Sequence, residues 1–134
     1  MKAGAILETV IYAADPQAAG RFYRDIFGLE EVRSVEGRFV FLRCGGQMLL
    51  IFNPEATRDP AHQNGIPAHG ATGAGHLCFR AEDRAELDRW RARLAGAGIP
   101  LEHEQIWKGG ARSIYLRDPA GNSVEIAEAA IWGL

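Results

Sequence analysis

The sequence has few cysteines and no long hydrophobic run, which argues against a cysteine-based metal or redox motif and against a membrane-spanning protein. Cys44 and Cys78 are its two cysteines, and their spacing matches no metal or redox motif. Each lies in an apolar, strand-like run, so we expect reduced, buried thiols, with a disulfide between them as the alternative. No apolar stretch approaches the length of a membrane span, which predicts a cytoplasmic protein without a membrane partner.

A strong excess of charge of either sign is also absent. The formal net charge is −2 and no lysine-rich run occurs, so nothing suggests binding to nucleic acid. Residues 84–96 mix arginines with aspartate and glutamate, which indicates the solvated face of a helix. With 47% hydrophobic and 24% charged residues, the composition is that of an ordinary globular domain.

One order of elements occurs twice along the chain. Each half reads as a strand, an amphipathic helix and three further strands, which predicts an α+β fold of two βαβββ modules. Module 1 is expected over about residues 5–53 and module 2 over about residues 75–130. The expected strands are 6–15, 29–36, 38–45, 47–53, 76–81, 101–107, 111–118 and 123–129, and the expected helices are 17–28 and 82–98.

Between the modules lies a polar stretch, about residues 54–74, that is rich in proline and glycine. It is too long for an ordinary connection between strands. The sequence predicts either a linker between the modules or a loop that closes over a site.

Side-chain alternation places three metal-ligating residues on the polar faces of the predicted sheets. Glu8, His76 and Glu125 each lie opposite the apolar set of their strand. Glu8 and His76 hold equivalent places in the first strands of the modules, and the counterpart of Glu125 is Leu50. Two modules that face each other would bring these four positions together.

This residue set is suited to a divalent metal ion. Two carboxylates and an imidazole suit manganese, iron(II), zinc, nickel or cobalt. Two carboxylates that converge in a desolvated pocket repel each other unless a cation neutralises them. Each residue also has a simpler explanation: His76 as a structural histidine, and Glu8 and Glu125 as solvent-facing residues of edge strands.

Two further side chains are candidates for catalysis. Tyr115 shares one side of its strand with Ser113 and Arg117, and an inward orientation would let Tyr115 position a substrate or donate a proton. An outward orientation would make all three ordinary sheet surface. His103 is a weaker candidate for a general base, with simple surface exposure as the alternative.

The chain as a whole resembles the vicinal oxygen chelate superfamily, which includes glyoxalase I, fosfomycin-resistance proteins, methylmalonyl-CoA epimerase, extradiol dioxygenases and bleomycin-resistance proteins. The resemblance is carried by LETVIYAADPQAAGRFYRDIFGLE, GHLCFRAEDRAELDRWRARLAGAGIPLE and SIYLRDPAGNSVEIAE. Its most specific part is the turn Asp118-Pro119-Ala120-Gly121-Asn122, followed by Glu125. It implies a partly open, eight-stranded, barrel-like cup and a homodimer.

The resemblance also implies roles for individual residues. The metal-binding glutamate of the family falls on Glu125 and its histidine on His76. Glu8 stands where histidine is usual, and Leu50 stands where four-ligand members carry glutamate or glutamine. Three ligands are closer to fosfomycin-resistance proteins and dioxygenases than to glyoxalase I or the epimerase. Tyr115 matches a tyrosine that contacts substrate in the fosfomycin-resistance transferases.

We therefore expect an enzyme in which Glu8, His76 and Glu125 hold one divalent ion. The ion would act as a Lewis acid on a small substrate with adjacent oxygens, in a lyase, transferase or dioxygenase reaction. The alternative is a metal-free protein that sequesters an aromatic or cationic compound, as bleomycin-resistance proteins do. Leu50 and the missing first-strand histidine favour this alternative, whereas the three aligned ligands oppose it.

Overall fold

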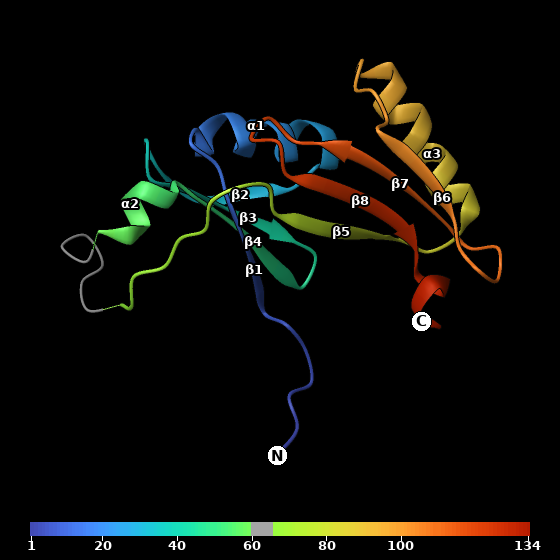
Figure 1. The fold of residues 1–134 in the computed structure, drawn as a ribbon, viewed down its shortest axis with the longest axis horizontal. Helices are drawn as coiled ribbons and strands as arrows, with labels where there is room; N and C mark the ends of the chain where they lie inside the picture. Colours follow the sequence, from blue (N-terminus) through green and yellow to red (C-terminus); the bar gives the residue numbers. More distant parts are fainter. Residues whose placement is uncertain (60–65) are drawn as a thin grey trace. The chain divides into compact units, whose positions relative to one another are not determined.

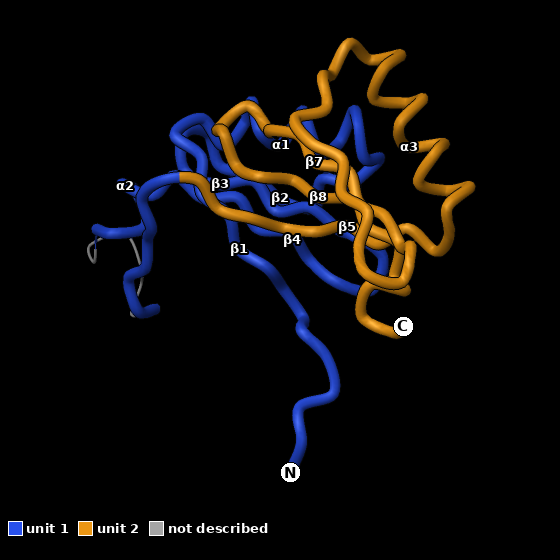
Figure 2. Tube along the Cα trace, turned by 45° about the vertical axis from the view of Figure 1, so that its right-hand side comes forward, with its two compact units in different colours: residues 1–73 blue, residues 74–134 orange. Residues whose placement is uncertain are grey.

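The computed structural model describes residues 1–59 and 66–134 (Figure 1). Residues 60–65, within the predicted connection, lie outside the described residues. The chain divides into two compact units, Met1–Gly73 and Ala74–Leu134 (Figure 2). Each unit contains a four-stranded sheet and one long helix, so the predicted α+β fold of two βαβββ modules is confirmed. Within the described ranges, no helix is long and apolar enough to cross a membrane.

The sheet of unit 1 has the strand order β1-β4-β3-β2. Strands β1 and β4 run parallel, and the other neighbours run antiparallel. The elements of unit 1 are β1 (Glu8–Tyr12), α1 (Pro16–Phe27), β2 (Glu30–Val35), β3 (Phe39–Cys44), β4 (Gln47–Phe52) and α2 (Pro54–Arg58).

Helix α1 begins and ends at the residues that helix capping favours. The Asp15 side chain accepts a hydrogen bond from the Ala18 backbone N–H, and Gly28 ends the helix in the left-handed conformation. The helix packs closely on β3, because a Cβ atom at Gly20 would lie 2.9 Å from Val40 Cγ1. One face of the sheet is therefore covered, and the face that carries Glu8 is the opposite one.

Helix α2 lies where only a loop was expected. The Asn53 side chain accepts hydrogen bonds from the backbone N–H groups of Glu55 and Ala56, and Pro54 occupies the first helical turn. An asparagine followed by proline is a helix-start signal. The proline- and glycine-rich composition of the surrounding stretch obscured this signal.

The sheet of unit 2 has the equivalent strand order, β5-β8-β7-β6. Helix α3 is capped by Asp83 and buries Leu87 and Leu94 against one face of this sheet (Figure 1). The same sheet face supplies Val124 and Ile126 to the core. The elements of unit 2 are β5 (His76–Ala81), α3 (Arg84–Gly96), β6 (His103–Ile106), β7 (Arg112–Arg117), β8 (Ser123–Glu128) and the short 3-10 turn η2 (Ala129–Trp132).

The two sheets share one internal register. Val10 pairs with Leu50 in unit 1, and Cys78 pairs with Glu125 in unit 2. Glu8 lies two residues before Val10, just as His76 lies two residues before Cys78. The strand register thus makes Leu50 the counterpart of Glu125.

The expectation of two buried thiols is wrong for Cys78. Both cysteines are free, Cys44 is half-buried and Cys78 is exposed. The reason is parity: Cys78 shares the polar side of β5 with His76, whereas Leu77 and Phe79 face the helix.

Candidate functional site

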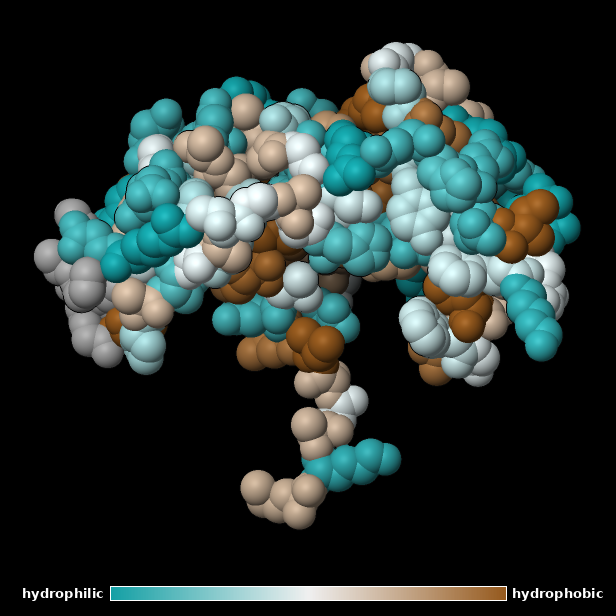
Figure 3. Space-filling model, in the orientation of Figure 1, coloured by the Kyte–Doolittle hydropathy of each residue, from teal (hydrophilic) through white to brown (hydrophobic). Residues whose placement is uncertain are grey.

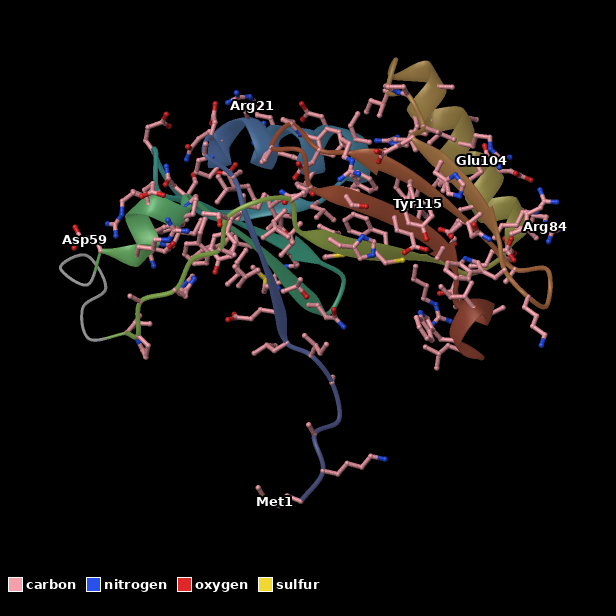
Figure 4. All side chains as sticks on the ribbon, viewed as in Figure 1. Met1, Arg21, Asp59, Arg84, Glu104 and Tyr115 are labelled. Atoms are coloured by element: carbon pink, nitrogen blue, oxygen red, sulfur yellow. The ribbon has the colours of Figure 1, made fainter. Side chains whose placement is uncertain are left out.

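The face of the unit 2 sheet opposite α3 carries a row of polar side chains. In the strand register, His103 pairs with Tyr115, Tyr115 with Glu125, and Glu125 with Cys78. Paired residues lie side by side on one face of a sheet, so the four side chains form a row across all four strands. Tyr115, the member of the row on β7, is labelled in Figure 4.

Glu125 is the buried centre of the row. Its carboxylate accepts a hydrogen bond from the Tyr115 hydroxyl at 2.8 Å and lies 3.3 Å from His76 Nε2. The residue is only 7% exposed, and β8 lies between β5 and β7. The alternative of a solvent-facing glutamate on an edge strand is therefore wrong. A carboxylate removed from water needs compensation, and here neighbouring donors supply part of it.

A chain of hydrogen bonds leads to this carboxylate. Trp107 Nε1–H donates to Ser113 Oγ at 2.8 Å, Ser113 donates to the Tyr115 hydroxyl at 3.3 Å, and Tyr115 donates to Glu125. Desolvation raises the pKa of Tyr115, and the Glu125 carboxylate adds to this rise while Ser113 opposes it. The Tyr115 hydroxyl therefore keeps its proton and fixes the orientation of the carboxylate.

His103 and Arg117 lie on the same sheet face but are more peripheral. The exposed His103 ring lies 5.9 Å from the Tyr115 ring, and its Nε2 is 3.2 Å from Gln105 Oε1. The Arg117 guanidinium donates two hydrogen bonds to Glu102, at 2.7 and 2.9 Å. The charge of Arg117 is thus already paired.

Cys78 belongs to this row, although its apolar sequence context predicts only a buried thiol. Desolvation and the adjacent Glu125 carboxylate raise the pKa of Cys78 to about 12. Its shared parity with His76 was the available signal. The thiol therefore stays protonated at neutral pH and can donate to the carboxylate.

This raised pKa predicts slow alkylation of Cys78. Only the thiolate reacts with iodoacetamide, so at pH 8 Cys78 should react slowly. Glu125→Gln removes the carboxylate that opposes ionisation of the Cys78 thiol. We therefore expect the substitution to accelerate alkylation of Cys78 several-fold, which corresponds to a fall of roughly half a unit or more in the pKa of Cys78. Peptide mass spectrometry measures the rate, with Cys44 in the same chain as the control. An unchanged Cys78 rate in Glu125→Gln would contradict the contribution of this carboxylate.

The turn before β8 positions the pair His76 and Glu125. Asp118 Oδ1 accepts from the backbone N–H groups of Ala120 and Asn122 at 2.9 and 2.8 Å. The Asn122 side chain donates to Asp118 Oδ2 at 2.9 Å and accepts from the Gly75 N–H at 2.8 Å. Because Gly75 directly precedes His76, this network ties the start of β5 to the start of β8.

The distance between the His76 and Glu125 donor atoms matches that between two ligands of one metal ion. Ligands about 2.1 Å from one ion, at tetrahedral or octahedral angles, lie roughly 3.0–3.4 Å apart, and His76 Nε2 and Glu125 Oε2 are 3.3 Å apart. Across residues 1–59 and 66–134, no three His, Cys, Asp or Glu side chains form a metal-holding group. The structure brings His76 and Glu125 together in unit 2, and Glu8, exposed on β1 of unit 1, stays the predicted third ligand.

Known proteins with this fold were compared with the chain. A solved lactoylglutathione lyase from Agrobacterium tumefaciens is 50% identical, with a TM-score of 0.97 and full coverage of both chains. Virulence protein STM3117 from Salmonella typhimurium is 26% identical over 123 residues, which are 89% of this chain and 80% of that protein. The solved structure of the Salmonella protein has a TM-score of 0.72 at 24% identity, covers 96% and 98% of the two chains, and shows the shared fold.

A protein-family model also matches this chain. The model of the Glyoxalase/Bleomycin resistance protein/Dioxygenase superfamily matches residues 5–126. This range contains module 1, module 2 as far as the middle of β8, and the predicted ligands Glu8, His76 and Glu125. The chain belongs to the Glyoxalase/Bleomycin resistance protein/Dioxygenase superfamily.

Proposed function

We propose that this protein is a divalent-metal-dependent enzyme that acts on a small substrate with adjacent oxygens, in a reaction of the lyase type. The observation that carries the proposal is the buried Glu125 carboxylate, 3.3 Å from His76 Nε2 and oriented by Tyr115. The lyase type is supported by the relative from Agrobacterium tumefaciens, which is 50% identical over the whole chain.

The residues of the row, together with His76, have distinct roles in this proposal. His76 and Glu125 hold the ion, Tyr115 orients the carboxylate, and Cys78 stays neutral beside it. A bound divalent ion supplies a Lewis acid that stabilises negative charge developing on substrate oxygen. His103, whose ring lies 5.9 Å from the Tyr115 ring at the exposed end of the row, is the candidate to take or return a substrate proton.

Turnover of lactoylglutathione by metal-loaded protein is the direct test. The name of the Agrobacterium protein makes this compound the first substrate to try. We expect turnover that chelation abolishes and that manganese, iron(II), zinc, nickel or cobalt restores. Activity that persists in the chelated protein would contradict a metal-dependent reaction. Failure on this compound with metal bound would move the search to other substrates with adjacent oxygens.

A metal-free binding protein is the second candidate, and Leu50 favours it. Leu50 is 8% exposed and stands at the position equivalent to Glu125, so unit 1 offers an apolar side chain where unit 2 offers a carboxylate. The two candidates differ in a measurable property: ligand binding by the second survives chelation, whereas catalysis by the first does not.

We also propose that the protein is a homodimer. Unit 2 exposes large apolar side chains, among them Trp132 at 79% and Leu134 at 76%, and Figure 3 shows brown, hydrophobic atoms at this C-terminal turn. Light scattering should give about twice the 14.6 kDa of one chain. Trp132→Glu is expected to weaken the dimer, because a charge opposes burial of this surface. A wild-type mass of one chain would contradict the proposal.

A further inference from the structure

Unit 1 contains a pocket of about 310 Å³ with an aromatic floor. Phe39 and Phe41 stack at 4.3 Å between ring centroids, and Phe52 meets Phe41 edge-on at 5.3 Å. All three rings are only half-buried, although Val40 and Leu42 on the opposite sheet face are completely enclosed under α1. The sheet therefore presents an accessible aromatic surface on the side away from its core.

The segment after α2 forms one wall of this pocket. The His69 ring stands edge-on to Phe52 at 4.9 Å, and its Nδ1 is 2.8 Å from the Tyr12 hydroxyl. The His69 backbone N–H donates to the Thr57 carbonyl, which ties the segment to α2. Because Tyr12 occupies Nδ1, a ligand in the pocket would meet the other ring nitrogen, Nε2.

The described rim of the pocket carries arginine side chains. Arg33 and Arg38 line it, and the described lining residues include no aspartate or glutamate. The Arg33 guanidinium lies over the Phe39 ring, 5.6 Å from its centroid, and leaves Phe41 and Phe52 as the rings beside it. A guanidinium in this position can pair with an anionic group whose ring rests on the phenylalanines.

We propose that this pocket binds a small aromatic anion. Its volume lies near the lower limit for small-molecule sites, which suits one or two fused rings. The phenylalanine floor stacks against the ring, and Arg33 pairs with a carboxylate or similar group on the ring edge. All described contacts of this site lie in unit 1 and require no metal ion, so the proposal goes beyond the metal-dependent chemistry. The phenylalanine floor lies on the sheet face that carries Glu8 and Leu50, because Phe41 pairs with Leu50 and Phe52 with Tyr12. The proposal therefore names a ligand class for the face that the metal-free candidate would use.

Calorimetric titration of the full-length protein with 2-naphthoate, in the presence of EDTA, tests this proposal. We expect saturable binding of one 2-naphthoate per chain. Neutral 2-naphthamide, which has the same rings, should bind about tenfold more weakly, because it lacks the charge-assisted pair. Arg33→Gln should weaken 2-naphthoate binding by about tenfold and leave 2-naphthamide binding unchanged.

Arg21→Gln is the matched control, because Arg21 is an exposed arginine of α1 (Figure 4). It should bind 2-naphthoate with wild-type affinity, and so should Glu125→Gln, in which only the proposed metal site is damaged. Three results would overturn the proposal: no saturable binding, equal affinities for the acid and the amide, or wild-type affinity in folded Arg33→Gln. Binding that appears only when metal replaces EDTA would overturn it as well.

Discussion

Glu125→Gln is expected to lower the affinity for divalent metal by more than about a hundredfold, since loss of a supporting residue alone costs 10- to 100-fold. The substitution keeps the shape of the side chain and an oxygen that can accept from Tyr115. It removes the negative charge beside His76, which is the feature that attracts a cation. Titration of metal-free protein, followed by calorimetry or by the rise in melting temperature, measures the change.

Glu128→Gln is the matched control for this prediction. Glu128 is a glutamate of the same strand, is similarly buried at 8% exposure, and pairs with Arg84 at 3.5 Å. It should keep wild-type metal affinity. The free energy of unfolding of metal-free Glu125→Gln should lie within about 2 kcal/mol of the wild-type value, because the Tyr115 hydrogen bond survives. Equal metal affinities in the two variants would contradict the proposed role of Glu125.

Asn122→Ala is expected to destabilise unit 2 by about 3 kcal/mol. Asn122 is 1% exposed, and its side chain bonds both Asp118 and the Gly75 backbone N–H. Alanine removes the acceptor from Gly75 and a donor from Asp118, and water cannot easily replace them. All three tryptophans, Trp90, Trp107 and Trp132, lie in unit 2, so fluorescence during urea unfolding reports on this unit.

Asn53→Ala is the control variant for the predicted destabilisation by Asn122→Ala. Asn53 caps the short helix α2 in unit 1, and its loss should cost only about 1 kcal/mol. It should leave unchanged the urea concentration at which unit 2 unfolds, as followed by tryptophan fluorescence. Asn122→Ala should also weaken metal binding, because the network sets His76 beside Glu125. An Asn122→Ala protein as stable as wild type would show that the turn does not hold these strands together.

The repeated order of strands and long helices could be predicted because these elements carry local signals, whereas the short helix α2 was missed. The apolar spacing of the helices and the alternation along β1, β5 and β8 depend on neighbouring residues alone. The same alternation placed Glu8, His76 and Glu125 on the polar faces of the sheets, and Cys78 shares the parity of His76. It did not predict burial, which depends on the neighbouring strands, so a buried Glu125 and an exposed Cys78 emerged only from the structure.

The contacts within the site were harder to predict than its residues. The sequence predicts that an inward Tyr115 positions a substrate or donates a proton, and it gives no sign that the hydroxyl donates to Glu125 or that Arg117 pairs with Glu102. These partners come from other strands, and their distances follow from the register rather than from any local pattern. The link from Trp107 through Ser113 has the same origin.

The metal content of the wild-type protein, purified without chelators, tests the central claim most directly. Elemental mass spectrometry should find about one divalent ion per chain, retained in Glu128→Gln and lost in Glu125→Gln. A wild-type protein that carries no divalent ion, and takes up none of added manganese, iron(II), zinc, nickel or cobalt, would contradict the account. It would leave the metal-free binding protein as the remaining candidate.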